Sequence, residues 1–177
     1  ILISLTEKTI NPINILTFLK DVNMANSKPY LSLPSNEPIK SYAPCTPERD
    51  EIKAKLQELQ DRQIEIPIII GGKEIRTGNM GKCILPHDHG TVIGTYHKAG
   101  EKEVQMAIET ALKAQKQWAE MDWQDRVSIF LRAADILAGP QRSLLNASSM
   151  LCQSKNVFQA EVDAACELID FFRFNAF

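Results

Sequence analysis

The chain has 177 residues, of which 44% are hydrophobic and 24% are charged, a composition typical of a globular protein. Its formal net charge of −2 at pH 7 gives no excess of basic residues of the kind that binds nucleic acid. No apolar run reaches the roughly 20 residues that cross a bilayer, because Lys20 and Asp21 interrupt the most apolar stretch near the N-terminus. We therefore expect a soluble protein with no nucleic-acid partner and no membrane span.

The four cysteines show no Cys-x-x-Cys spacing. A chain of this length can form a hydrophobic core without disulfides, so we expect reduced thiols of an intracellular protein. The cysteines are Cys45, Cys83, Cys152 and Cys166.

The first 34 residues differ in composition from the rest of the chain. Residues 1–23 have no continuous helical or strand periodicity, and Met24 is the first methionine. Two interpretations stay open: translation starts at Met24 and the earlier residues come from an incomplete transcript, or these residues are a divergent targeting or disordered arm. The region before Cys45 contains acidic residues but no arginine, unlike a mitochondrial presequence. We assign residues 1–34 to an unstructured or upstream-derived arm, and residues 35–177 to one truncated domain.

The residues after the arm first predict an extended segment and then a helix. Pro29, Pro34, Pro38 and Pro44 exclude a continuous helix and favour an extended chain lying on a larger surface. Thr46 is a candidate N-cap with proline at the first helical position and acidic residues in the first turn. The helix should run to about residue 61 and bury Ile52, Leu56 and Leu59.

A β-hairpin and two further extended segments should follow. Residues 66–70 form a β-branched run, Gly71 and Gly72 tolerate positive φ, and residues 73–77 can return as the second strand. Residues 82–85 and 91–97 are also expected to be extended, separated by a turn over residues 86–90.

Amphipathic helices are predicted over residues 101–120, from about 123 to the Gly139-Pro140 terminator, over 142–152 and from about 157. The last helix is expected to leave Glu161, Asp163 and Glu167 away from its apolar side, which comprises Phe158, Val162, Ala165, Leu168, Ile169 and Phe172. The chain stops at Phe177 without a helix-terminating residue, which indicates a fragment. The fold class predicted is α/β, with an incomplete main sheet.

Several residue groups could carry chemistry, but each has a simpler interpretation. His87, Asp88 and His89 could start a metal site, although no further cluster completes it and a polar turn is favoured. Residues 78–82 superficially resemble a phosphate loop and are better read as a turn between strands. Cys152 lies near Lys155, but a buried helix cysteine is the better interpretation.

Aromatic side chains at helical spacing could suggest a cofactor box, but such residues usually belong to a core. They are Trp118, Phe130, Phe171, Phe172 and Phe174. Glu161 lies among small residues that leave room beside its carboxylate. From these residues alone, a solvent-facing glutamate paired with a neighbour is the more frequent outcome.

The order of several motifs resembles the N-terminal part of the aldehyde dehydrogenase superfamily. The general resemblance rests on residues 70–74, the helix from Glu103 to Trp118, and the segment from Arg126 to Leu137. The finer resemblance is to the Δ1-pyrroline-5-carboxylate dehydrogenase branch, and it covers residues 35–176. It rests on the motifs at residues 35–38, 47–50, 133–135 and 139–140, and on the long block at 159–176.

This resemblance implies NAD-dependent oxidation of L-glutamate γ-semialdehyde to L-glutamate in proline catabolism. In such enzymes a cysteine thiolate attacks the aldehyde, hydride passes to the nicotinamide, and a glutamate activates the water that hydrolyses the thioester. The resemblance places the catalytic residues and the NAD-binding sheet beyond this chain, so no catalytic, cofactor-binding or metal residue is assigned here. It implies that Glu161 is a substrate-binding residue that meets the α-ammonium group of the substrate.

Two local departures from the family pattern are present. Residues 154–156 read Ser-Lys-Asn where the family has Gly-Lys-Thr, and residues 87–90 read His-Asp-His-Gly where it has Phe-Asn-His-Gly. The resemblance further implies a homo-oligomer acting on a small molecule in the mitochondrial matrix, or otherwise in the cytoplasm. Two alternatives remain: another aldehyde dehydrogenase, such as one acting on succinate semialdehyde, and a non-catalytic truncated interaction module. We expect the chain alone to be inactive.

Overall fold

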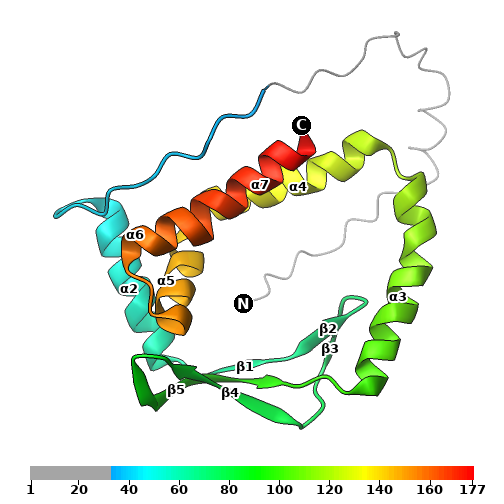
Figure 1. Cartoon of the computed structure of the whole chain (residues 1–177), viewed down its shortest axis with the longest axis horizontal. Helices are drawn as coiled ribbons and strands as arrows, with labels where there is room; N and C mark the ends of the chain where they lie inside the picture. Colours follow the sequence, from blue (N-terminus) through cyan, green and yellow to red (C-terminus); the bar gives the residue numbers. More distant parts are fainter. Residues whose placement is uncertain (1–32) are drawn as a thin grey trace, which may run out of the picture. The chain divides into compact units, whose positions relative to one another are not determined.

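The computed structural model describes residues 33–177 (Figure 1). The predictions for residues 1–32, including the start at Met24, lie outside the described residues. An extended segment leads into the first described helix, α2 (Pro47–Asp61), which begins and ends where the sequence predicts. Thr46 is its N-cap residue, but the Thr46 hydroxyl donates to the carbonyl of Ala43 at 2.8 Å and makes no hydrogen bond to the helix amides.

Five strands follow in two sheets. Strands β1 (Ile64–Ile66), β5 (Asp88–His97) and β4 (Met80–Leu85) lie in that order, with β1 parallel to β5 and β4 antiparallel to β5. Strands β2 (Ile68–Ile70) and β3 (Lys73–Ile75) form the predicted hairpin. The turn residues Gly71 and Gly72 have φ values of 59° and 75°, which explains the need for glycine.

Several strand boundaries differ from the prediction: β3 ends at Ile75 rather than at residue 77, and β4 begins at Met80 rather than at residue 82. The β-branched run divides at Pro67, which lacks an amide donor, so Ile66 pairs in β1 while the hairpin starts at Ile68. Strand β5 already begins at Asp88, so the turn predicted over residues 86–90 is shorter. Gly94 is required where β5 meets β1, because a Cβ atom there would lie 2.8 Å from the carbonyl oxygen of Ile64.

Helices α3 (Glu101–Glu120), α4 (Trp123–Ala138) and α5 (Arg142–Gln153) confirm the predicted positions. The last helical segment consists of α6 (Val157–Gln159), the π-helix η1 (Ala160–Cys166) and α7 (Glu167–Ala176). Helices α4 and α7 run side by side (Figure 1). No described helix is long and apolar enough to span a membrane.

The π-helix changes which side chains of the last segment are buried. A π-helix has i→i+5 hydrogen bonds and therefore more residues per turn than the α-helix assumed in the prediction. Ala165 and Ile169 are buried as expected, but Phe158 is 63% exposed, and Glu161 is completely buried instead of lying away from the packed side. The predicted placements of Phe158 and Glu161 were therefore wrong.

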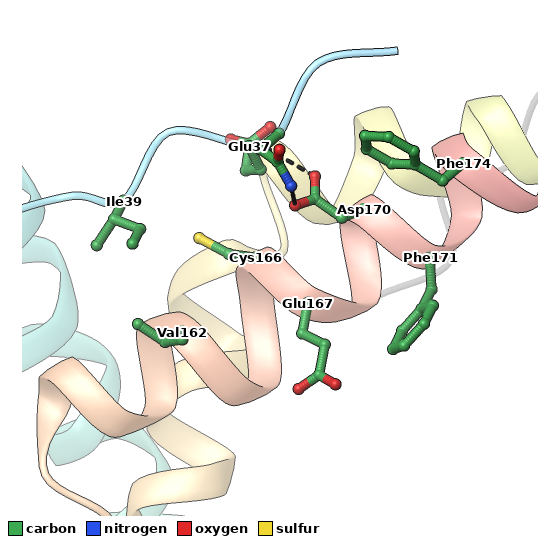
Figure 2. Close-up of a pocket in the computed structure, with 9 residues that line it drawn as sticks. Glu37, Ile39, Val162, Cys166, Glu167, Asp170, Phe171 and Phe174 are labelled. Carbon is green, nitrogen blue, oxygen red and sulfur yellow. Dashed lines mark hydrogen bonds between the residues drawn. The ribbon is translucent and has the colours of Figure 1, made fainter.

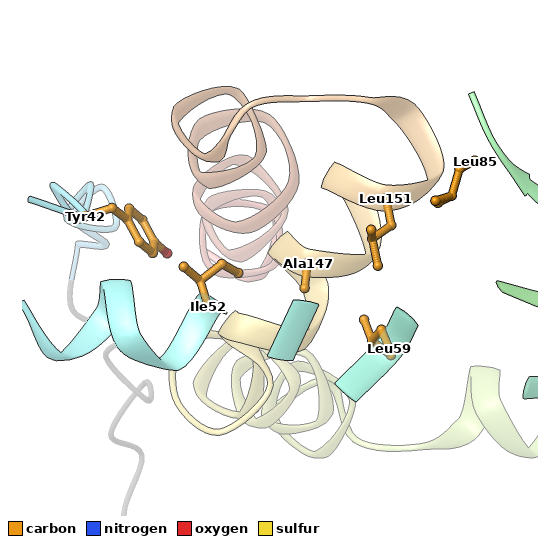
Figure 3. Packing of buried hydrophobic residues seen from close by; sticks show 6 residues of the cluster. All are labelled: Tyr42, Ile52, Leu59, Leu85, Ala147 and Leu151. Carbon is orange, nitrogen blue, oxygen red and sulfur yellow. The ribbon is translucent and has the colours of Figure 1, made fainter. Parts of the chain in front are cut away.

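The described residues form two hydrophobic clusters. The larger lies between α2, α5 and the strands, and Figure 3 shows its members Tyr42, Ile52, Leu59, Leu85, Ala147 and Leu151. The smaller joins α4 to the last helical segment through Ala134, Ala165 and Ile169. These clusters hold α5 and η1, the two elements that carry the candidate site.

Other predicted core residues lie at the surface of the described chain. Helix α3 has no buried residue, and its apolar residues Val104, Ile108 and Leu112 are exposed. Trp118 contacts Phe130 edge to face at a ring separation of 6.4 Å, and Phe130 contacts Phe172 at 5.9 Å. Four of the five aromatic residues predicted as core are nevertheless exposed, namely Trp118, Phe130, Phe171 and Phe174.

Candidate functional site

The centre of the candidate site is the buried carboxylate of Glu161 on η1. It accepts hydrogen bonds from the backbone N–H of Lys40 and from the hydroxyl of Tyr42, each at 2.8 Å. The Asn146 amide donates at 2.7 Å, and Arg142 donates from Nη2 at 2.5 Å and from Nε at 3.3 Å. Both carboxylate oxygens therefore have protein donors.

Three separate segments bring these groups together. The extended segment before α2 supplies Lys40 and Tyr42, and prolines on both sides favour its extended backbone. Helix α5 supplies Arg142 and Asn146, which share one helix face because they are four residues apart. The π-helix then turns Glu161 toward both segments.

Arg142 extends this site into a buried charge cluster, which we define as Glu37, Arg142, Glu161 and Arg173. The Arg142 guanidinium is 3% exposed and forms ion pairs with both Glu161 and Glu37. Glu37 also pairs with Arg173 at 2.5 Å. The two carboxylates are thus matched by two guanidinium groups, as burial of charge requires.

The extended segment is fixed at a second point on α7. Asp170 accepts hydrogen bonds from the Asn36 side chain and the Glu37 backbone N–H, both at 2.7 Å (Figure 2). A groove of about 580 Å³ lies beside these contacts, lined by apolar side chains that include Ile39, Phe171 and Phe174. Glu161 does not line this groove.

The surroundings keep Glu161 ionised. Burial alone would raise the pKa of Glu161, but hydrogen bonds led by that from Arg142 outweigh burial and lower the pKa. Burial likewise opposes the charge of Arg142, yet its bonds to Glu161 and Glu37 raise the pKa of Arg142 above its ordinary value. Burial and the neighbouring carboxylate raise the pKa of Tyr42, so this hydroxyl stays protonated.

The thiols near the site are not activated. Cys166 lies 3.3 Å from Arg142 Nη2, but burial and the charge of Glu161 raise its pKa to about 11. Cys152, farther away in α5, is exposed and not buried as predicted, but partial desolvation of its thiol also raises its pKa. Because the thiolate is the nucleophilic form, this arrangement suits charge pairing and hydrogen bonding rather than covalent attack.

The other sequence candidates lie elsewhere. Within residues 33–177 no group of three potential metal ligands comes together, and His87 contacts Ser154 at 2.8 Å. This contact joins the two segments, residues 87–90 and 154–156, in which the sequence departs from the pattern of the family it resembles. Ser154 has φ of 54°, a left-handed conformation that favours glycine. The turn predicted over residues 78–82 is shorter, because β4 already begins at Met80; the Gly78 N–H before it donates to His97 at 3.1 Å.

The sequence singled out Glu161 but not its partners Tyr42, Arg142 and Asn146, nor Glu37, which pairs with Arg142. Glu37 and Arg142 are separated by 105 residues, so spacing gives no indication that they meet. The available signal was the i,i+4 pair of Arg142 and Asn146 in a helix of otherwise small and apolar residues.

Comparison with known proteins identifies the family. The sequence pattern of the aldehyde dehydrogenase family matches residues 75–177. The chain is 49% identical over 141 residues to the Delta-1-pyrroline-5-carboxylate dehydrogenase of Agaricus bisporus, covering 79% of the chain and 26% of that protein. It is 42% identical over 142 residues to the mitochondrial human enzyme of the same name, covering 80% of the chain and 25% of that protein.

A solved structure agrees with these relatives. The Delta-pyrroline-5-carboxylate dehydrogenase of Mycobacterium tuberculosis, bound with NAD, matches with a TM-score of 0.83 and 42% identity, over 86% of this chain and 29% of that one. The chain thus spans about a quarter of the length of the curated relatives. The predicted α/β fold, with part of its sheet outside the chain, is confirmed. These matches show that the chain belongs to the aldehyde dehydrogenase family.

Proposed function

We propose that the protein containing this chain oxidises L-glutamate γ-semialdehyde, formed from Δ1-pyrroline-5-carboxylate, to L-glutamate with NAD. The observation that supports this most strongly is the identity of 42–49% to Delta-1-pyrroline-5-carboxylate dehydrogenases over about four fifths of the chain. Within the described residues, the ionised carboxylate of Glu161 is the group that we assign to the charged substrate.

The described residues provide no group suited to attack an aldehyde. Cys152 and Cys166 both have raised pKa values, so neither provides the thiolate that attacks an aldehyde. We propose that the nucleophile, the general base and the NAD-binding residues belong to the part of the enzyme outside this chain, and that the 177-residue chain alone is inactive. Its own contribution is Glu161 and the cluster that orients it.

The experiment is a comparison of two aldehydes with the full-length enzyme. Purified protein should form NADH with glutamate semialdehyde at a higher kcat/KM than with succinate semialdehyde. A preference for succinate semialdehyde would favour the alternative dehydrogenase. NADH formation by the 177-residue chain alone would contradict the proposal that the catalytic and NAD-binding residues lie outside it.

We further propose that Glu161 recognises the α-ammonium group of the substrate. Its carboxylate stays ionised, and π-helical segments are frequently found at functional sites. All its present contacts are to protein donors, so an ammonium group would replace one of them or share an oxygen with it. Lys40 N–H, Tyr42 and Asn146 are the neutral donors in this set, and replacement of one of them leaves the Arg142 ion pair intact.

Substitution of Glu161 by Gln gives the corresponding prediction. Loss of a hydrogen bond to a charged group costs about 1.5–3 kcal/mol, which is roughly a ten- to hundredfold fall in kcat/KM for glutamate semialdehyde. Aldehydes without an amino group should be affected much less. An equal fall for both kinds of aldehyde would assign Glu161 a purely structural role.

Assembly and location complete the proposal. We propose a homo-oligomer that works on a small molecule in the mitochondrial matrix, since the human relative is named as a mitochondrial enzyme. Size-exclusion chromatography with light scattering tests the assembly. Fractionation of the cells that express the natural protein tests the location.

A further inference from the structure

A second cavity lies away from the charge cluster, between α2, the three-stranded sheet and α5. Its volume is about 190 Å³. Its apolar walls are formed mainly by Leu59 of α2, Ile64 of β1, Ile93 of β5 and Leu151 of α5. Figure 3 shows Leu59 and Leu151 at this interface between the helices.

The few polar groups of the cavity are uncharged. They are the hydroxyl of Ser148 and the thiols of Cys83 and Cys152. Burial, and after it the proximity of Cys83, raises the pKa of Cys152, which keeps this thiol neutral. Among the described residues that line the cavity, none carries a charge. A charged guest would therefore lose its hydration without gaining an ion-pair partner.

The volume of the cavity limits the size of the molecule that it can bind. An engineered apolar protein cavity of about 150 Å³, lined by leucine, isoleucine and phenylalanine, remains dry and binds benzene. The cavity of this chain is slightly larger and has a similar lining. Two of its lining residues, Ile66 and Cys152, are exposed, so a small molecule can reach it from solvent.

We propose that this cavity is a binding site for an uncharged apolar molecule about the size of one six-membered ring. Burial of the ring against the leucine and isoleucine side chains supplies the favourable free energy. The site is independent of the aldehyde chemistry proposed above, because it shares no residue with the charge cluster.

The cysteines provide the test in the full-length protein, with benzene as the probe. Alkylation of Cys83 by iodoacetamide is followed by peptide mass spectrometry, with the exposed Cys45, which does not line the cavity, as the internal control. At a benzene concentration about three times the dissociation constant, alkylation of Cys83 should slow about fourfold, because about a quarter of the sites remain empty. Alkylation of Cys45 should not change.

Two controls make the result specific. Benzoate, which has the same ring and a charge, should not protect Cys83. Ser148→Leu should fill the cavity and abolish protection by benzene, whereas Ser128→Leu, the same change at an exposed position of α4, should retain it. Equal alkylation of Cys83 with and without benzene would overturn the proposal. So would protection by benzoate equal to that by benzene, or full protection in Ser148→Leu.

Discussion

At the scale of single residues, the decisive feature is the mutual dependence of Arg142 and Glu161. Each is buried and each is the main counter-ion of the other. A buried ion pair contributes little net stability compared with apolar residues, because desolvation offsets the attraction. Removal of one partner is costly, since the other then remains buried without compensation.

Arg142→Met is accordingly expected to lower the free energy of unfolding by about 3–5 kcal/mol, because it leaves the Glu161 and Glu37 carboxylates without their shared partner. Arg142→Lys should cost less, as it retains the charge but not all the directed N–H groups. Urea denaturation of the full-length protein measures both.

Arg76→Met is the matched control. Arg76 also contacts two carboxylates, those of Glu65 and Glu74, but its side chain is 53% exposed. Exposed ion pairs contribute little to stability, because water screens them, so Arg76→Met should change the free energy of unfolding much less than Arg142→Met does. Similar losses for Arg76→Met and Arg142→Met would show that burial does not govern the cluster.

The lowered pKa of Glu161 also predicts how stability depends on pH. The folded protein binds a proton at Glu161 less readily than the unfolded chain does, so protonation favours unfolding. The stabilisation is fully present above the ordinary carboxyl value of about 4.5 and is lost as the pH falls through the lowered pKa of the folded state.

Urea denaturation midpoints measured between pH 6 and pH 3 test this pH dependence of stability. Glu161→Gln should be less stable at neutral pH, and its stability should fall less steeply on acidification because the amide does not titrate. The remaining slope comes from other carboxylates, such as Glu65, whose pKa the hydrogen bond from His97 lowers. An unchanged slope would contradict the assigned ionisation of Glu161.

At the scale of secondary-structure elements, local sequence signals placed the helix ends accurately. Pro47 starts α2 and Gly139-Pro140 ends α4, because proline fits the first helical turn and disfavours helix in the residue before it. The exception is η1, whose wider π turns place Glu161 inward; Phe158, in α6 just before it, is exposed. An α-helical period cannot predict such a change, which depends on what the segment packs against.

Substitution of Gly94 tests how closely strand β1 pairs with strand β5. Gly94→Ala would place a methyl group against the backbone of Ile64, so β1 must move away from β5, at a cost of about 1–3 kcal/mol. Gly90→Ala lies on the same strand, where the nearest atom, Asp88 Oδ1, is at an ordinary 3.5 Å.

Urea denaturation should therefore show a clearly lower free energy of unfolding for Gly94→Ala than for Gly90→Ala. Amide hydrogen exchange in β1 and β5 should increase in Gly94→Ala and remain close to wild type in Gly90→Ala. Equal stability of the two variants would show that β1 is not held tightly against β5.

At the scale of the whole molecule, helix α3 presents an unpaired apolar face. Val104, Ile108 and Leu112 recur at four-residue spacing and are all exposed in the described chain. Exposed apolar patches of this kind favour association. We therefore predict that the 177-residue chain, produced by itself, associates in solution.

Leu112→Glu should reduce that association by placing a charge within the patch. Gln105→Glu adds the same charge at an exposed position of α3 outside this row and should have a smaller effect. Dynamic light scattering of the two variants at equal concentration gives the comparison. A monodisperse monomer of the unmodified chain would contradict the prediction.

The sequence by itself determined the family resemblance, the order of elements and most helix ends, since these depend on residues near one another in the chain. It also singled out Glu161, whose small neighbours in the helix leave room for a carboxylate. Only the tertiary structure decided that Glu161 is buried, that Tyr42, Arg142 and Asn146 surround it, and that Arg142 also pairs with Glu37. These contacts join segments about 100 or more residues apart, or follow from the π-helical turn of η1. Local periodicity carries no information on either, because both arise from packing between segments rather than from the preferences of one segment.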